Sequence, residues 1–269
     1  MKLIDRRAIL QGFAGILAGT PWCRTAAAAS LDTPIIAAAS TLRFCLGDIA
    51  KAFAAAGGGS LRLTFGSSGN LARQVEQGAP FALFMSADEN YALRLVQAGF
   101  APDNGALYAI GRLALIARKG GPIGVDAQLK GLRAAQRSGR LHRFAIANPA
   151  HAPYGMRARE ALIHAGLWRP LQPRLVLGEN VAQAAQYAET GAAEAGLVAS
   201  ALALSPRIAR KLNTAIIPDS WHNPLRQRMV LLKAGSLAQN RQARAFYDFL
   251  QGAGARRILQ RAGFSLPAL

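Results

Sequence analysis

The sequence predicts an α/β protein whose mainly parallel sheets are covered on both faces by helices. Short apolar segments alternate with amphipathic segments of helical period through most of the chain after about residue 30. Glycines and helix-capping residues separate these segments at short intervals. Such alternation is typical of sheets built from repeated strand–helix units.

Composition supports a folded chain with a substantial core. Of its 269 residues, 51% are hydrophobic and 17% are charged, which excludes a disordered protein. At about 150 residues per domain, the length predicts one large domain or two modest ones. Two cysteines are too few for a disulfide-rich scaffold or a four-cysteine zinc site.

Residues 1–29 have the pattern of an export signal. A basic start that includes Arg6-Arg7 is followed by an uncharged run, 8–23, and by small residues up to Ala29. This order is typical of a cleaved secretory peptide, and the paired arginines favour the twin-arginine type. Cleavage there lowers the formal net charge from +18 to +15 and leaves Cys45 as the one cysteine.

Eight short apolar segments predict strands. Glycine, proline or polar residues bound most of them, and most are shorter than a usual helix. In order, they are 33–38, 61–65, 81–85, 108–117, 144–147, 174–177, 195–198 and 229–233. The run 108–117 is the longest, and we expect it to form one continuous strand.

Helices are expected between these strands and after the last of them. Their predicted ranges are 42–56, 71–77, 86–99, 126–136, 156–165, 180–189, 236–251 and 254–262. Ser40 or Thr41 is expected to cap the first helix, and Glu179 or Asn180 the sixth. The S-x-x-E sequence at 86–89 is a capping box for the third.

Four loops that follow strands share one chemistry. They are 39–41, 66–69, 152–155 and 179–181, and apart from Glu179 they carry no charged side chain. Loops at the carboxyl ends of strands are the usual ligand sites of α/β proteins. Hydroxyls, free backbone N–H groups and helix N-termini suit an anion that is bound and released without chemistry. The alternative is that these serines and threonines merely cap helices.

Several motifs resemble those of the periplasmic molybdate-binding proteins of molybdate ABC transporters. The most specific are FGSSGNLARQ at 65–74, GAP at 78–80 and SADE at 86–89. Others are YAIGRL at 108–113, NP at 148–149, APYG at 152–155 and FYDFL at 246–250. The resemblance runs over about residues 33–266.

This resemblance implies a two-lobed type II periplasmic binding protein fold that closes over a tetrahedral oxyanion. Carried over by motif, the oxyanion ligands are the following residues: Ser40, Thr41 and Ser68 through hydroxyls, with Tyr154 and Val181 through backbone N–H groups. Ala199 stands where many members have a binding tyrosine, and Thr41 is the residue that compensates. Arg43 either points at the cleft or lies on a solvated face, and His151 either lines the cleft or lies on the surface.

Elementary chemistry points to the same ligand class. Phosphate near neutral pH keeps a proton and needs an acceptor, which three of the four loops lack. Glu179, in the fourth loop, is read as a helix-start residue, because acidic residues favour that end of the helix dipole. Fully deprotonated dianions such as molybdate, tungstate and sulfate need only donors, so discrimination among them depends on cavity size.

Other site classes have weak support. The four histidines (His142, His151, His164, His222) are scattered without metal-ligand spacing, so no metal is expected to bind protein side chains directly. Gly66–Gly69 lacks the G-x-S-x-G spacing of a nucleophile elbow, and no phosphate-loop motif is present. The arginines are dispersed, which argues against nucleic-acid binding; the positive charge instead favours encounter with anions.

We therefore expect a periplasmic, monomeric binding protein without enzymatic activity or cofactor. Lobe one is predicted to span 31–110 and 222–269, and lobe two 111–221. The chain would cross between them near 110–111 and 219–223. A membrane permease with a cytoplasmic ATPase is the partner that the resemblance implies. The alternatives are a binding protein for another oxyanion such as sulfate, and an exported enzyme on the same scaffold.

Overall fold

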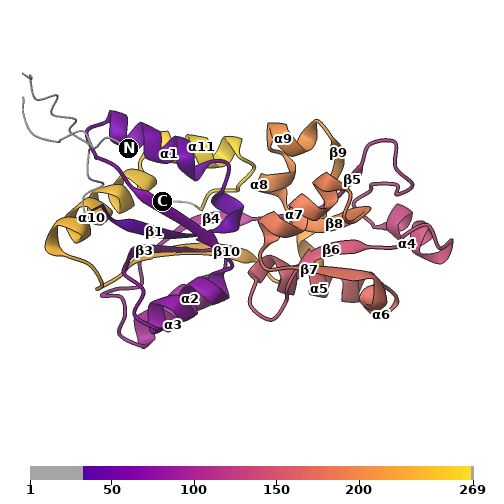
Figure 1. Cartoon of the computed structure of the whole chain (residues 1–269), viewed down its shortest axis with the longest axis horizontal. Coiled ribbons are helices and arrows are strands. Elements are labelled where there is room, and N and C mark those ends of the chain that lie inside the picture. Colours follow the sequence, from indigo (N-terminus) through magenta and orange to yellow (C-terminus); the bar gives the residue numbers. More distant parts are fainter. Residues whose placement is uncertain (1–32, 268–269) are drawn as a thin grey trace, which may run out of the picture. The chain divides into compact units, whose positions relative to one another are not determined.

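Two five-stranded sheets organise the chain. The computed structural model describes residues 33–267, and the predicted export signal at 1–29 lies outside them. The first sheet has the strand order β2-β1-β3-β10-β4, and the second has the order β7-β6-β8-β5-β9 (Figure 1). Each sheet with its helices forms one lobe, called lobe one and lobe two.

The strands of the two lobes are interleaved in the sequence only at β10. Lobe one holds β1 (Ile35–Ala39), β2 (Arg62–Gly66), β3 (Phe81–Ser86), β4 (Ala106–Gly111) and β10 (Leu225–Leu231). Lobe two holds β5 (Leu113–Arg118), β6 (Phe144–Ala147), β7 (Leu175–Gly178), β8 (Ala195–Ala199) and β9 (Leu212–Ile216). Only β10 in the first sheet and β5 in the second run against the other four strands, so both sheets are mainly parallel, as predicted.

Helices cover both faces of each sheet. Lobe one contains α1 (Leu46–Ala55), α2 (Ser68–Glu76), α3 (Glu89–Gln97), α10 (Leu237–Gln251), α11 (Ala253–Arg261) and the single turn η1 (Ser40–Leu42). Lobe two contains α4 (Lys130–Arg137), α5 (Pro153–His164), α6 (Trp168–Leu171), η2 (Gln172–Arg174), α7 (Val181–Thr190), α8 (Ser200–Ala203) and α9 (Pro206–Ala209). The short turn η3 (Asp219–Trp221) precedes β10.

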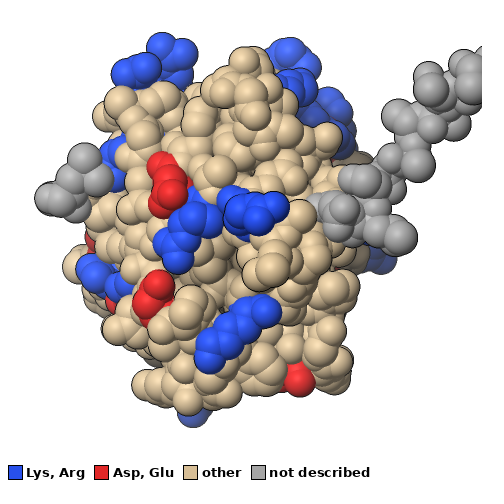
Figure 2. Space-filling model, turned by 90° about the vertical axis from the view of Figure 1, so that its left-hand side faces the viewer, with Lys and Arg blue, Asp and Glu red and all other residues tan. Residues whose placement is uncertain are grey.

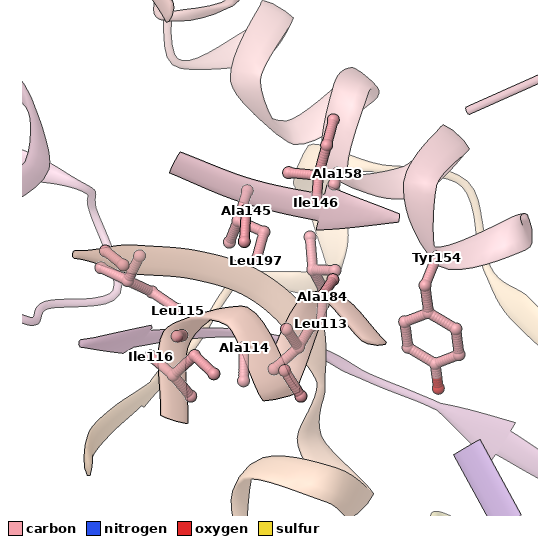
Figure 3. Packing of buried hydrophobic residues seen from close by; sticks show 14 of the residues in the cluster. Leu113, Ala114, Leu115, Ile116, Ala145, Ile146, Tyr154, Ala158, Ala184 and Leu197 are labelled. Atoms are coloured by element: carbon pink, nitrogen blue, oxygen red, sulfur yellow. The ribbon is translucent and has the colours of Figure 1, made fainter. Parts of the chain in front are cut away.

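The cores follow from the alternation of side chains along the strands. In β1, Ile36 and Ala38 pack with α1, α10 and α11, whereas Ala37 packs with α2 and α3 on the other face. In lobe two, the side chains of β5, β6 and β8 pack with those of α5 and α7 in one large cluster (Figure 3). Continuous apolar strands such as these are the pattern of sheets buried on both faces.

The chain passes between the sheets at two places. Arg112 alone separates β4 from β5, and residues 217–224 separate β9 from β10. The expected continuous strand at 108–117 is therefore wrong, because the strand breaks at Arg112 where its two halves join different sheets.

Several local predictions differ from the structure. The expected capping box at 86–89 is wrong, because Asp88 is the residue whose side chain caps α3. Ser86 instead bonds the backbone of Asp88. The helix expected at 42–56 begins at Leu46, after η1. The helix expected from 126 begins at Lys130, because the carboxylate of Asp126 accepts the N–H groups of residues 128, 130 and 131.

None of the helices in the described part of the chain is both long and apolar enough to cross a membrane.

Cys45 gives a direct test of the lobe-one core. Cys45 is the N-cap residue of α1, and its thiol is buried. Burial, aided by the nearby Asp48 carboxylate, raises the pKa of this thiol to about 12. Because the thiolate is the reactive form, we expect Cys45 in a Cys23→Ser variant to resist a thiol reagent at pH 8. The same thiol should react fully in denaturant. Rapid reaction of the native protein, measured as released chromophore, would contradict this packing.

Candidate functional site

The site is a small cavity at the carboxyl ends of four parallel strands. η1, α2, α5 and α7 begin directly after, or within a few residues of, β1, β2, β6 and β7. About 10 Å³ of the cavity is open to the centre of a water-sized sphere. Its lining residues, from both lobes, are Ala39, Ser40, Thr41, Gly66, Ser67, Ser68, Ala87, Ala152, Pro153, Tyr154 and Val181.

All five residues predicted from the sequence line this one cavity: Ser40, Thr41, Ser68, Tyr154 and Val181. Each is at most 4% exposed. Lobe one supplies the first three and lobe two the other two. The structure therefore brings together side chains and backbone groups that are far apart in the sequence, such as Ser40 and Val181.

The serine hydroxyls are oriented by backbone N–H groups. The N–H of Ala87 donates to Ser68 Oγ over 2.9 Å, and the N–H of Ala182 donates to Ser40 Oγ over 3.4 Å. Each oxygen is thus used as an acceptor, which leaves its own O–H free to donate. Thr41 Oγ1 is buried and has no hydrogen-bond partner among the described residues.

The helix N-termini contribute backbone donors. Pro153 occupies the first position of α5 and has no N–H, so Tyr154 provides the first donor of that helix. At α7, Asn180 caps the N–H groups of Ala182 and Gln183, and Val181 comes before both. The N–H groups of Tyr154 and Val181 have no partner within their helices, because the first turn of a helix leaves such groups unpaired.

The alternative that the serines merely cap helices is wrong for this site. Ser67 is the N-cap residue of α2, yet no side chain among the described residues caps that helix. The Ser67 hydroxyl instead lies 2.9 Å from Nδ1 of His151 in lobe two. Likewise, no described side chain caps η1 or α5. Their positive ends therefore remain available to an anion.

The cavity contains no charged side chain. Tyr154 is its one titratable residue, and burial raises the pKa of this phenol well above its ordinary value, so it stays neutral. Its hydroxyl points away from the aliphatic cluster of lobe two (Figure 3) and accepts a hydrogen bond of 3.1 Å from Nε2 of Gln227 on β10. A Cβ at Gly111 would lie 2.1 Å from this hydroxyl, so glycine is needed beside it.

Charged groups near the cavity are paired elsewhere. Asp88 accepts a 2.8 Å hydrogen bond from Arg157, and both side chains are buried. Glu179, expected to serve the start of a helix, instead accepts from the amide of Asn70, and Asn180 alone caps α7. No carboxylate among the described residues lines the cavity, so a protonated anion finds no acidic acceptor there.

The structure also gives the positions, relative to the cavity, of three residues whose role the sequence did not decide. Arg43 is exposed and lines a neighbouring groove with Gln186 and Arg207, outside the cavity. Ala199 is buried and does not line the cavity. His151 is partly buried and bonded to Ser67, rather than free on the surface.

Sequence reasoning missed Ser67 and Gln227. Ser67 stands beside Ser68 in the FGSSG motif, so its position gave a signal. Gln227 lies on β10 and belongs to no motif that the sequence analysis could recognise. Only the fold brings its amide to the Tyr154 hydroxyl. Among the described residues, no group of histidine, cysteine or acidic side chains is arranged to hold a metal ion. The arrangement can hold a small anion by donors alone.

Comparisons with known proteins agree with this geometry. The solved periplasmic molybdate-binding protein of Azotobacter vinelandii superposes with a TM-score of 0.78 and 32% identity, over 87% of this chain and 100% of that chain. This match confirms the two-lobed fold. The sulfate-binding protein SubI from Mycobacterium tuberculosis has a TM-score of 0.71 at 16% identity, over 87% of this chain and 86% of that chain, which shows the fold alone.

Sequence relatives give the family. The molybdate-binding protein ModA of Rhodobacter capsulatus is 34% identical over 219 residues, which cover 81% of this chain and 82% of that protein. ModA of Azotobacter vinelandii is 32% identical, over 86% of this chain and 89% of that protein. Residues 35–265 match the family described as bacterial extracellular solute-binding protein. The chain therefore belongs to this family of binding proteins rather than enzymes, and its resemblance to the molybdate-binding proteins is confirmed.

Proposed function

We propose that this protein binds molybdate, and also tungstate, between its two lobes and delivers it to an ABC importer. Ser40, Thr41 and Ser68 would donate hydroxyl hydrogen bonds, and Tyr154 and Val181 would donate backbone N–H groups. The observation that carries the proposal is the buried cavity in which these five residues meet without any charged side chain. The names of its relatives, several of them molybdate-binding proteins, support the same ligand.

The donor set favours a fully deprotonated anion. Each hydroxyl and N–H group stabilises negative charge, and helix N-termini add about half a positive charge each. Hydrogen phosphate would bring a proton into a cavity without a carboxylate to accept it, which costs binding free energy. Molybdate, tungstate and sulfate carry no such proton at neutral pH.

Sulfate is the second candidate, since a sulfate-binding protein shares the fold. Sulfate is smaller than molybdate, and a donor shell built for the larger ion would leave some of its donors too far from sulfate oxygens. The motifs and relatives favour the larger ion.

Binding between lobes requires them to move apart and together. We propose that lobe one spans 31–110 with 222–269 and that lobe two spans 111–221. The membership of the two sheets supports this division except at Gly111, which ends β4 of the first sheet. The crossings at Arg112 and at 217–224 would act as the hinge, and closure would bury the anion between the two sets of helix ends.

We further propose that the protein works as a monomer in the periplasm, after export and cleavage of residues 1–29. The closed form would present both lobes to a membrane permease whose ATPase powers uptake. Lysines and arginines are spread over the face drawn in Figure 2, interrupted by uncharged residues and a few acidic side chains. Such a distribution suits general attraction of anions more than a nucleic-acid track.

Ligand identity can be tested by thermal unfolding with an anion panel. At 100 times its Kd, a ligand adds about 2.7 kcal/mol to the free energy of unfolding. For a chain of this size, that corresponds to a rise in Tm of about 5–11 °C. We expect this rise with molybdate and tungstate, a smaller one with sulfate and none with phosphate. A rise with sulfate or phosphate but not with molybdate or tungstate would overturn the proposed ligand.

The two serines can be tested one at a time. Hydrogen bonds to a charged group contribute about 1.5–3 kcal/mol, so Ser40→Ala and Ser68→Ala should each weaken molybdate binding about 10- to 100-fold in calorimetric titrations. Ser60→Ala, at an exposed serine of lobe one, is the matched control and should bind normally. Unchanged affinity in both cavity variants would exclude these hydroxyls as ligands.

A further inference from the structure

A second set of contacts joins the lobes beside the cavity. Ser67, Gly69 and Asn70 begin α2 in lobe one, and His151 and Glu179 lie in the loops before α5 and α7 in lobe two. We propose that these five residues form a latch that holds the lobes closed and sets the rate at which the bound oxyanion leaves. The role of the latch in release rests on the proposed function.

His151 is the centre of the latch. Its Nδ1 lies 2.9 Å from Ser67 Oγ, and its Nε2 lies 3.6 Å from Glu179 Oε2. The side chain is only 13% exposed, whereas that of Glu179 is 59% exposed. The imidazole therefore lies between the two lobes, with its inner nitrogen on a residue that lines the cavity and its outer nitrogen facing solvent-exposed Glu179.

Two further contacts connect the same surfaces. The backbone N–H of Gly69 donates to the carbonyl oxygen of His151 over 3.0 Å. The amide of Asn70 donates to the carboxylate of Glu179, and Arg73 donates in turn to the Asn70 amide oxygen. Side-chain and backbone hydrogen bonds thus join the same two surfaces, so the start of α2 is fixed relative to the loops before α5 and α7.

Gly69 is required for the lobes to come this close. A Cβ at this position would lie 2.6 Å from the His151 carbonyl oxygen, a distance that real Cβ atoms essentially never show. The obstacle is backbone, so a side-chain rotation cannot relieve it. Any larger residue at position 69 must push the His151 loop away from α2.

The latch lies away from the two chain crossings, so it can control how readily the lobes open. The lobes are joined covalently only at Arg112 and 217–224, and none of the latch residues belongs to these crossings. Separation of the lobes about the crossings must break the latch contacts. It must also break the bond from Ala182 N–H to Ser40 Oγ and the ion pair of Arg157 with Asp88, which join the lobes as well. Each latch hydrogen bond therefore stabilises the closed, anion-bound form relative to an open form and slows its opening.

The test is the rate of release of radiolabelled molybdate into an excess of unlabelled molybdate. His151→Ala should speed release about tenfold, and Gly69→Ala by at least as much, while association rates change less than about twofold. His151→Asn, which can still bond Ser67, should restore part of the slow release. His142→Ala removes an exposed histidine of lobe two and should release at the wild-type rate.

A double-mutant cycle tests whether the hydrogen bond between Ser67 and His151 is the one that slows release. If Ser67 and His151 work through one hydrogen bond, the double alanine variant should release scarcely faster than His151→Ala alone. An unchanged release rate in both His151→Ala and Gly69→Ala would overturn the latch. It would also be overturned if the association rates of these variants fell by as much as their release rates rose. If wild-type protein retains no molybdate, the proposed function fails instead, and the same chase with radiolabelled sulfate then decides the latch.

Discussion

The structure depends on a buried cavity that supplies hydrogen-bond donors and excludes charged side chains. A doubly negative guest in such a place is stabilised by oriented dipoles, with no cation to hold it permanently. The fold makes this possible because the carboxyl ends of β1, β2, β6 and β7 lead to helical turns whose first residues share the cavity. Release then needs no chemistry, only separation of the lobes.

Small local features keep the donors available. The Ser67 hydroxyl is bonded to His151 and does not cap α2, and Asn180 caps the second and third N–H groups of α7 while leaving that of Val181. At α5, Tyr154 is fixed from the other side by Gln227, in a space that only a glycine at 111 permits. Ser67 and Tyr154 therefore both line the cavity and make hydrogen bonds between the lobes.

Much of the fold could be predicted from the sequence, because apolar periodicity and capping residues are local signals. The segment 144–147 was predicted with its observed bounds, and the five cavity residues were found from motifs. The crossing near 110–111 was expected from the family resemblance, although apolar periodicity alone predicted an unbroken strand there. The antiparallel course of β10 and the start of α4 could not be predicted, because pairing between distant strands and the Asp126 carboxylate decide them. For the same reason, no sequence pattern placed His151 against Ser67.

The most direct measurement is an anomalous difference map from crystals grown with molybdate, collected at the molybdenum absorption edge. We expect one strong peak in the cavity, with oxygen atoms within hydrogen-bonding distance of Ser40 Oγ, Ser68 Oγ and the backbone nitrogens of Tyr154 and Val181. A peak elsewhere on the molecule, or an anion held by charged side chains, would contradict binding by uncharged donors between the lobes.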